Sequence, residues 1–356
     1  MTQTLRKGWT TGACAAAAAR AAFTALHGGG FPDPVTIRLP GGQTPSFALA
    51  RRERHPGSAT AGVVKDAGDD PDVTHGALVL ATVEAGPAGG GVTFRAGAGV
   101  GTVTLPGLPL PPGEPAINPG PRAQIAANIA EAAASLGLAA DAVVTVSIPG
   151  GEDLATRTLN ARLGILGGLS ILGTTGVVLP YSCAAWVESI RRGVDVATAL
   201  GIGELAAATG KTSEAAIRRA HPLPDQAFID MGDLAGALLK ALRAKPCRRL
   251  LLAGGPAKLA KLAAGKMDLH SRAGAADLGR LADMLAGLGA DAATVAAARG
   301  ADSVAQALAL AAPLPLADAI ARRAREVTLA VLSGGTDVEI WVVDRKGAVI
   351  GRAGGA

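Results

Sequence analysis

The pattern of apolar and polar residues divides the chain near Pro180 into two parts. Before Pro180, short apolar and β-branched runs alternate with clusters of Gly, Pro and Asp, which is typical of mostly antiparallel strands. Alanine-rich stretches at 14–26 and 122–136 have high helix propensity. We therefore expect an α+β domain over residues 1–180, with Gly/Thr and Pro-rich loops. Its predicted strands are 35–39, 47–50, 62–65, 77–84, 91–95 and 142–148.

After Pro180, β-type runs alternate with helical periods. Predicted helices follow each of the strands 204–209, 227–231 and 249–253. This alternation favours a parallel sheet, so we expect an α/β domain with a Rossmann-like layout over 181–326, helical in its last third. The closing β-type runs are 327–332, 338–344 and 348–352. They predict a C-terminal β-hairpin over 327–356, with a turn at Arg345-Lys346-Gly347.

The composition and the charge of the chain indicate which class of ligand it binds. Of the 356 residues, 49% are hydrophobic, which is enough for a sizeable core and excludes general disorder. The net charge of +5 is spread in small groups rather than in one basic stripe. Only three Trp, one Tyr and five Phe are present, so a base-stacking surface for nucleic acid is not expected. An anionic small molecule fits this balance better.

Cysteine usage and the longest apolar run indicate a cytoplasmic protein that does not enter a membrane. Cys14, Cys183 and Cys247 are far apart and form no C-x-x-C pair, which predicts reduced thiols. The low-charge run 163–179 is rich in glycine and shorter than the ~20 apolar residues that a membrane span needs.

Two segments of the first part carry candidate chemistry. Thr10-Thr11-Gly12 precedes a predicted helix, so it is either a simple N-cap or an anion-binding helix N-terminus. Cys14 next to it is either a nucleophile or a buried, inert thiol. Four carboxylates within seven residues, followed by a histidine, crowd one short loop: Asp66, Asp69, Asp70, Asp72 and His75. This loop is either an acid/base cluster or a solvated turn, and it lacks the spacing of a calcium-binding loop.

The second part offers glycines and a carboxylate where predicted strands end: Gly210, Asp230, Gly254 and Gly255. Ligands of open α/β sheets bind at the carboxyl ends of strands, and a carboxylate there suits a ribose. Ordinary strand–helix turns are the alternative. Two phosphate-binding patterns fail. The glycine run 97–101 does not lead into a helix, and Gly210-Lys211 lacks the upstream glycine of a P-loop.

Five segments together resemble the cobalt-precorrin-5B C(1)-methyltransferase family, the CbiD family. They include GWTTGACAAAAA from Gly8, KDAGDDPDVTHGA from Lys65 and KLAKLAAGKMDLHSR from Lys258, with the segments 99–122 and 144–176 between them. The resemblance implies an α+β domain joined to an α/β domain. It also implies methyl transfer from S-adenosylmethionine to C-1 of cobalt-precorrin-5B, giving cobalt-precorrin-6A in anaerobic cobalamin biosynthesis.

With this activity, S-adenosylmethionine is the expected co-substrate, bound at Gly210, Asp230, Gly254 and Gly255. Cobalt enters only as part of the anionic tetrapyrrole, and no resident metal is expected. Candidates to hold the substrate carboxylates are Thr10, Thr11, Gly12, Arg122, Thr174 and Thr175. His75, Asp66, Asp69 and Asp72 are candidate bases. A homo-oligomer is compatible with the sequence.

One departure from the family pattern falls after the third strand of the α/β part. A Gly-His-Ile-Gly-Lys pattern is expected there, and this chain has Gly254-Gly255-Pro256-Ala257-Lys258. Two other functions remain open from the residues alone. One is a small-molecule kinase with a phosphate loop at 10–14, and the other is a corrinoid carrier without catalysis.

Overall fold

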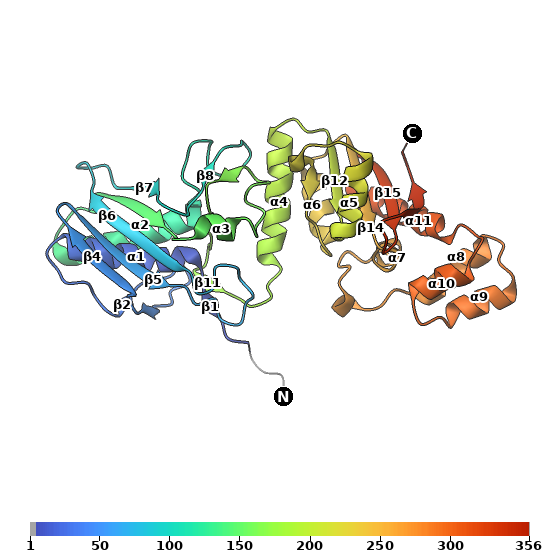
Figure 1. The fold of residues 1–356 in the computed structure, drawn as a ribbon, viewed down its shortest axis with the longest axis horizontal. Coiled ribbons are helices and arrows are strands. Elements are labelled where there is room, and N and C mark those ends of the chain that lie inside the picture. Colours follow the sequence, from blue (N-terminus) through green and yellow to red (C-terminus); the bar gives the residue numbers. More distant parts are fainter. Residues whose placement is uncertain (1–4, 356) are drawn as a thin grey trace. The chain divides into compact units, whose positions relative to one another are not determined.

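The computed structural model describes residues 5–355, which divide into two units after Ser182 (Figure 1). Unit 1 is the part up to Ser182 and unit 2 begins at Cys183. Among the described residues, none of the helices combines the length and the apolar character needed to cross a membrane.

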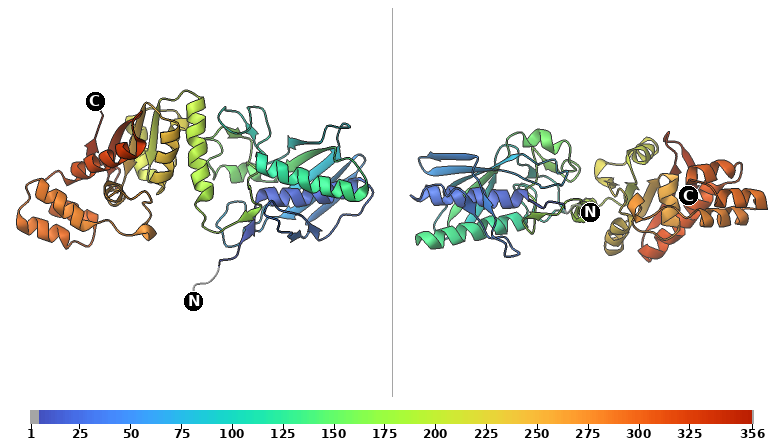
Figure 2. Two further views of the ribbon diagram at one scale, coloured as in Figure 1. Left: turned by 180° about the vertical axis from the view of Figure 1, so that it is seen from behind. Right: turned by 90° about the horizontal axis from the view of Figure 1, so that it is seen from below.

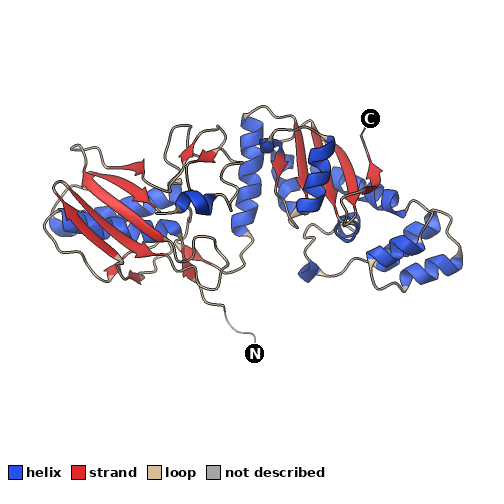
Figure 3. Ribbon diagram, viewed as in Figure 1, coloured by secondary structure: helices blue, strands red, loops and turns tan. Residues whose placement is uncertain are grey.

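Unit 1 contains a five-stranded sheet in the order β4-β5-β6-β9-β7 (Figure 3). Its strands are β4 (Arg51–His55), β5 (Ser58–Val64), β6 (Leu78–Ala85), β9 (Ala142–Ser147) and β7 (Val92–Ala96). All neighbours are antiparallel except β7 and β9, which confirms the mostly antiparallel character predicted for this part. Strand β4 was not expected from the sequence, because Arg-Arg-Glu-Arg-His has no apolar position. A charged edge strand of this kind resists pairing with another chain.

Helices α1 (Thr11–Leu26) and α2 (Pro119–Leu136) lie side by side, with α1 against β5 and β6 (Figure 2). Both run in the same direction, because Gly12 faces Pro121 at one end and Arg20 reaches Asn128 further along. The alanines of α1 are buried along nearly its whole length, and their small side chains let sheet and helix approach closely. The two helix N-termini therefore lie at the same end of unit 1.

Short strand pairs connect the loops of unit 1. They are β1 (Gly8–Trp9) with β11 (Val177–Val178), β2 (Val35–Thr36) with β3 (Ser46–Phe47), and β8 (Thr102–Val103) with β10 (Ile165–Leu166). The glycine run at 97–101 lies here, beside the short helix α3 (Gly151–Ala155). A side chain on Gly151 or Gly168 would overlap the backbone of Gly99. Glycine is therefore needed at these positions so that the two backbone segments can lie in direct contact.

Unit 2 contains a second five-stranded sheet in the order β13-β12-β14-β15-β16. Its strands are β12 (Glu204–Ala208), β13 (Phe228–Ile229), β14 (Arg249–Gly254), β15 (Asp337–Val343) and β16 (Val349–Ala353). Four of them are parallel, as predicted, and β16 pairs antiparallel with β15. By chain order the arrangement is 2-1-3-4-5, which differs from the order of the classic Rossmann fold. The strand order reverses between β12 and β14.

The predicted strand at 327–332 is wrong, because these residues form the end of helix α11 (Leu316–Leu332). Ala321, Ala324, Thr328 and Leu332 are buried, and their spacing of three and four is that of one helix face. The expectation of a separate hairpin over 327–356 also needs correction, because β15 pairs in parallel with β14 and so completes the main sheet.

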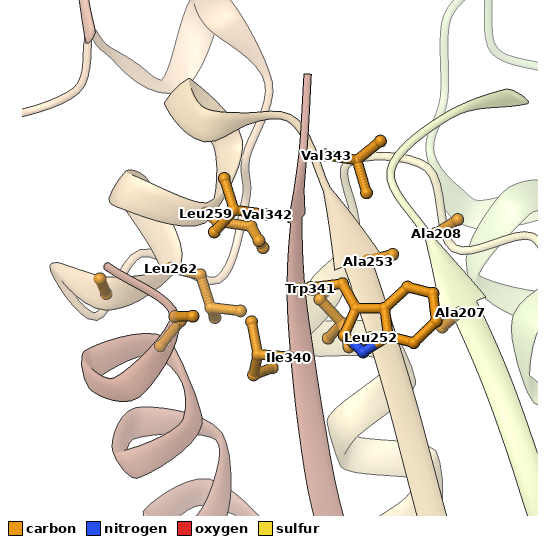
Figure 4. Packing of buried hydrophobic residues seen from close by; sticks show 14 of the residues in the cluster. Ala207, Ala208, Leu252, Ala253, Leu259, Leu262, Ile340, Trp341, Val342 and Val343 are labelled. Carbon is orange, nitrogen blue, oxygen red and sulfur yellow. The ribbon is translucent and has the colours of Figure 1, made fainter. Parts of the chain in front are cut away.

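Helices α4 (Ala184–Ala199), α5 (Lys211–Ala220), α6 (Ala235–Ala244) and α7 (Pro256–Ala263) pack around this sheet. Helices α8 (Leu278–Gly287), α9 (Ala292–Arg299) and α10 (Val304–Leu310) form a separate cluster that contacts α7 and α11 instead of the strands (Figure 1). Ile340 and Val342 of β15 point toward Leu259 and Leu262 of α7, whereas Trp341 points to the opposite side (Figure 4). Both faces of the sheet are thus buried, as expected for a parallel sheet.

Candidate functional site

The four residues predicted to bind the co-substrate come together at the carboxyl edge of the unit 2 sheet: Gly210, Asp230, Gly254 and Gly255. Asp230 follows the pair formed by Ile229 of β13 and Ala207 of β12. The next strand pair, Ala208 with Ala253, places Gly254 at the same level. Because β12 and β14 flank the reversal of strand order, this edge is the place where open α/β sheets bind ligands.

The N-terminus of α5 presents unused hydrogen-bond donors at this edge. Gly210 is the N-cap, and no side chain caps the helix. Within residues 5–355, the N–H groups of Lys211, Thr212 and Ser213 have no hydrogen-bond partner. The Ser213 hydroxyl donates to the Gly210 carbonyl at 2.9 Å. These donors and the positive end of the helix dipole favour an anionic or polar group.

Sequence reasoning missed two charged residues at the same edge, Asp233 and Lys258. The Lys258 ammonium donates to the Thr209 carbonyl at 3.1 Å and forms an ion pair with Asp233. It thereby connects the ends of β12 and β13 to helix α7. Lys258 could have been found from the sequence, since it is the first residue of a segment that resembles the family. Its ion pair with Asp233 could not be predicted from the spacing of the two residues.

In unit 1, most of the predicted substrate-binding residues gather where α1 and α2 begin. The Thr10 hydroxyl accepts from the N–H of Ala13 at 3.2 Å, and the N–H of Gly12 donates to the Leu172 carbonyl at 3.0 Å. Thr10 therefore acts as a cap and Gly12 is already partnered. In the part of the chain that the structure describes, the N–H groups of Thr11 and Gly120 have no partner.

The loop with Thr174 and Thr175 closes over these helix ends, and both threonines are exposed. Gln124 of α2, which is 3% exposed, donates to the carbonyls of Gly173 and Thr174 at 2.7 and 3.3 Å. Its Oε1 is buried without a partner among the described residues. The loop is thus held in place by hydrogen bonds from Gln124, a buried residue that the sequence did not indicate.

Arg122 is turned toward its own chain. Its guanidinium donates to the carbonyls of Ile117 and Pro115 and to the carboxylate of Glu114, at 2.7, 3.0 and 2.8 Å. It also lies over the ring of Phe94. These contacts hold the Pro-rich loop before α2, and they occupy most of the donors that a substrate carboxylate would need.

The acidic loop is an ordered network rather than a free cluster of carboxylates. Hydrogen bonds from Arg6, and then from the N–H of Gly68, lower the pKa of Asp66 to about 2. Burial alone would raise the pKa of Asp72, but the charge and hydrogen bond of Lys65, with Thr74, outweigh it and lower that pKa. Both carboxylates are therefore poor bases. Asp69 is exposed, and its Oδ2 accepts from the N–H of Arg6 at 2.6 Å.

His75 has a defined tautomer. Its Nδ1 accepts from the N–H of Ala67 at 3.1 Å, so in the neutral ring the proton is on Nε2. The exposed ring is thereby set to donate rather than to accept. Cys14, in contrast, is 0% exposed within α1, and burial raises its pKa to about 12. The nucleophile alternative for Cys14 loses its physical basis, because only a thiolate is reactive.

Comparison with known proteins places the chain in a family. The family model described as CbiD matches residues 1–180, and the one described as CbiD, C-terminal domain, matches residues 268–354. A protein of Paramagnetospirillum magneticum named cobalt-precorrin-5B C(1)-methyltransferase is 58% identical over 99% of both chains. One of the same name from Halorhodospira halophila is 57% identical over 99% of this chain and 95% of its own.

A solved structure is also similar, the cobalamin biosynthesis protein (cbiD) from Archaeoglobus fulgidus. It is 29% identical, with a TM-score of 0.41, and the match covers 76% of this chain and 83% of that one. On the match of both family models and the near full-length identity to the curated relatives, this chain belongs to the CbiD family.

Proposed function

We propose that this chain is a C-methyltransferase that moves a methyl group from S-adenosylmethionine to C-1 of cobalt-precorrin-5B, giving cobalt-precorrin-6A. The observation that carries the proposal is the match over 99% of the chain to relatives named for this reaction. Such a reaction asks the protein mainly to hold two reactants in alignment and to exclude water. It needs one site for a nucleoside-bearing donor and one for an anionic macrocycle.

The carboxyl edge of the unit 2 sheet is the proposed site for S-adenosylmethionine, in a nucleoside-binding unit of Rossmann-like kind. When bound, this co-substrate supplies an electrophilic methyl group on its sulfonium. The free N–H groups at the start of α5 suit its carboxylate, and Asp230 suits its ribose hydroxyls. At Gly255 the space where a side chain would lie is open, so a ligand can approach the backbone there.

The paired helix N-termini of unit 1 are the proposed site for substrate carboxylates. The free N–H groups of Thr11 and Gly120 and the exposed hydroxyl of Thr174 supply the donors. The exposed hydroxyl of Thr175 already donates to the Val177 carbonyl at 3.2 Å, so a substrate carboxylate would have to replace that acceptor. The two parallel helix dipoles add positive potential at the same end. Arg122 supports this site by holding the loop that leads into α2.

A proton must leave the macrocycle after methylation, and the acidic loop offers two exposed groups, Asp69 and His75, that are not ion-paired with the side chains of Arg6 and Lys65 in the described residues. We assign the base to Asp69, with His75 donating from Nε2 to the substrate. Asp69→Asn should then lower kcat about a hundredfold, as for loss of a general base. Asp66→Asn is the matched control, because that carboxylate is tied to Arg6 and should not affect kcat per folded molecule. Equal kcat in wild type and Asp69→Asn would remove the assignment.

The reaction itself is tested by incubating the protein anaerobically with S-adenosylmethionine and cobalt-precorrin-5B. A mass gain of one methylene unit that needs both protein and co-substrate supports the proposal. Tight binding of the tetrapyrrole without any mass gain would favour the carrier alternative instead.

A further inference from the structure

Trp186 lies exposed at the carboxyl edge of unit 2, and its ring is fixed there. It stands in the first turn of α4 and is 45% exposed. The other two tryptophans differ, since Trp341 is buried in the core of unit 2 and Trp9 packs edge-on against Phe47 in unit 1. Because the indole is half exposed at this edge, its ring has surface available for contact with a ligand.

Two contacts fix the indole. Its Nε1 donates to the backbone carbonyl of Asp230 at 2.8 Å, so the ring is attached to the first residue after β13. Its benzene edge lies against Gly232, where a side chain would come within 2.5 Å of the ring. Gly232 also has a φ of +50°, which favours glycine. The ring is therefore oriented by the end of β13 itself.

The position of the ring matches one part of a nucleoside. Asp230 is the carboxylate proposed to bind the ribose, and Trp186 contacts the backbone of that same residue. In a nucleoside the base is attached directly to the ribose. A flat aromatic surface next to the ribose-binding residue is thus placed where the base would lie.

We infer that Trp186 is the stacking surface for the adenine ring of S-adenosylmethionine. This inference rests on the proposed function, since it names the residue that recognises the base of the proposed co-substrate. Stacking accounts for both the exposure of the ring and its attachment to Asp230. Gly232 then serves to keep one edge of the indole close to the strand end.

The test measures binding of S-adenosylhomocysteine, and of adenosine alone, by titration calorimetry on the full-length protein. Loss of base stacking on Trp186→Ala should weaken both ligands about tenfold or more. Trp186→Phe keeps a smaller aromatic face and should lose less. Val187→Ala is the matched control, because Val187 is the next residue of α4 and is also exposed. Thermal unfolding verifies that each variant is folded.

Fluorescence gives a second readout. Quenching of tryptophan emission by S-adenosylhomocysteine should persist in Trp9→Phe and disappear in Trp186→Phe. Binding within twofold of wild type in Trp186→Ala, with methyl transfer intact in the wild type, overturns the inference and leaves the proposed function standing. A wild-type protein that binds neither S-adenosylhomocysteine nor adenosine overturns both.

Discussion

The ammonium of Lys65 is buried in unit 1 and forms an ion pair with Asp72, seven residues along the same loop. Lys65 is 1% exposed, and its Nζ also donates to the hydroxyl of Thr74 at 2.6 Å. The acidic loop is thus folded around a buried positive charge. This relationship explains why a segment with so many carboxylates is ordered, and it separates carboxylates with a structural role from those that face solvent.

Replacing Asp72 by Asn should destabilise the protein by roughly 3 kcal/mol, because it leaves the Lys65 charge buried without its counter-ion. The free energy of unfolding in urea measures this loss. The double variant Lys65→Met/Asp72→Asn removes the charge as well and should recover part of the stability. If Asp72→Asn unfolds with the wild-type free energy, the ion pair is not structural.

The pair between Arg6 and Asp66 predicts a pH dependence of stability. The pKa of Asp66 is lowered in the folded protein to about 2, from the usual 3.8. The stabilisation is therefore complete above pH 3.8 and is lost as the pH falls toward 2. Because both side chains are exposed, solvent screens the pair and its effect on stability is small.

Asp66→Asn should accordingly be slightly less stable than wild type at pH 6, and the difference should narrow as the pH falls to 3. Urea unfolding at a series of pH values measures the difference. A gap of constant size over this range would mean that the carboxylate charge contributes nothing to it.

The three cysteines should react very differently with iodoacetamide. Cys14 is buried with a pKa of about 12, and burial also raises the pKa of Cys247, whereas Cys183 is exposed. Mass spectrometry of the native protein should find label on Cys183 alone, and on all three after unfolding. Cys14→Ala should keep methyl transfer. Fast labelling of Cys14 in the native protein would show that α1 opens far more readily than its packing indicates.

The direct backbone contact between Gly168 and Gly99 in unit 1 should make larger residues destabilising at these positions. Gly168→Ala would drive a methyl group into the backbone at Gly99, so we expect a loss of about 1–3 kcal/mol and a lower Tm. Gly30→Ala is a suitable control, because nothing lies within 4 Å of the position of its added methyl group. Equal Tm values for the two variants would argue against this packing.

Sequence reasoning found elements whose apolar pattern decides their structure. The strand at 77–84 and the helix at 122–136 agree with β6 and α2 to within a few residues. The prediction of secondary structure was wrong where contacts between residues distant in sequence determine the structure. Val327–Leu332 has β-branched residues, yet its apolar positions continue the face of α11 and it stays helical.

The candidate site shows the same division. Gly210, Asp230 and Gly254 could be placed at one edge, because strand ends follow from the alternation of strands and helices. The burial of Lys65 and the exposure of Trp186 could not be predicted, since each depends on residues that only the folded chain brings into contact.

The most direct test of the proposed reaction uses S-adenosylmethionine labelled with ¹³C in its methyl group. The protein is incubated anaerobically with this donor and cobalt-precorrin-5B, and the product is examined by ¹³C NMR. We expect one labelled methyl group, attached to C-1 of the macrocycle. Label on another carbon, or unlabelled tetrapyrrole recovered from active conditions, would contradict the assignment.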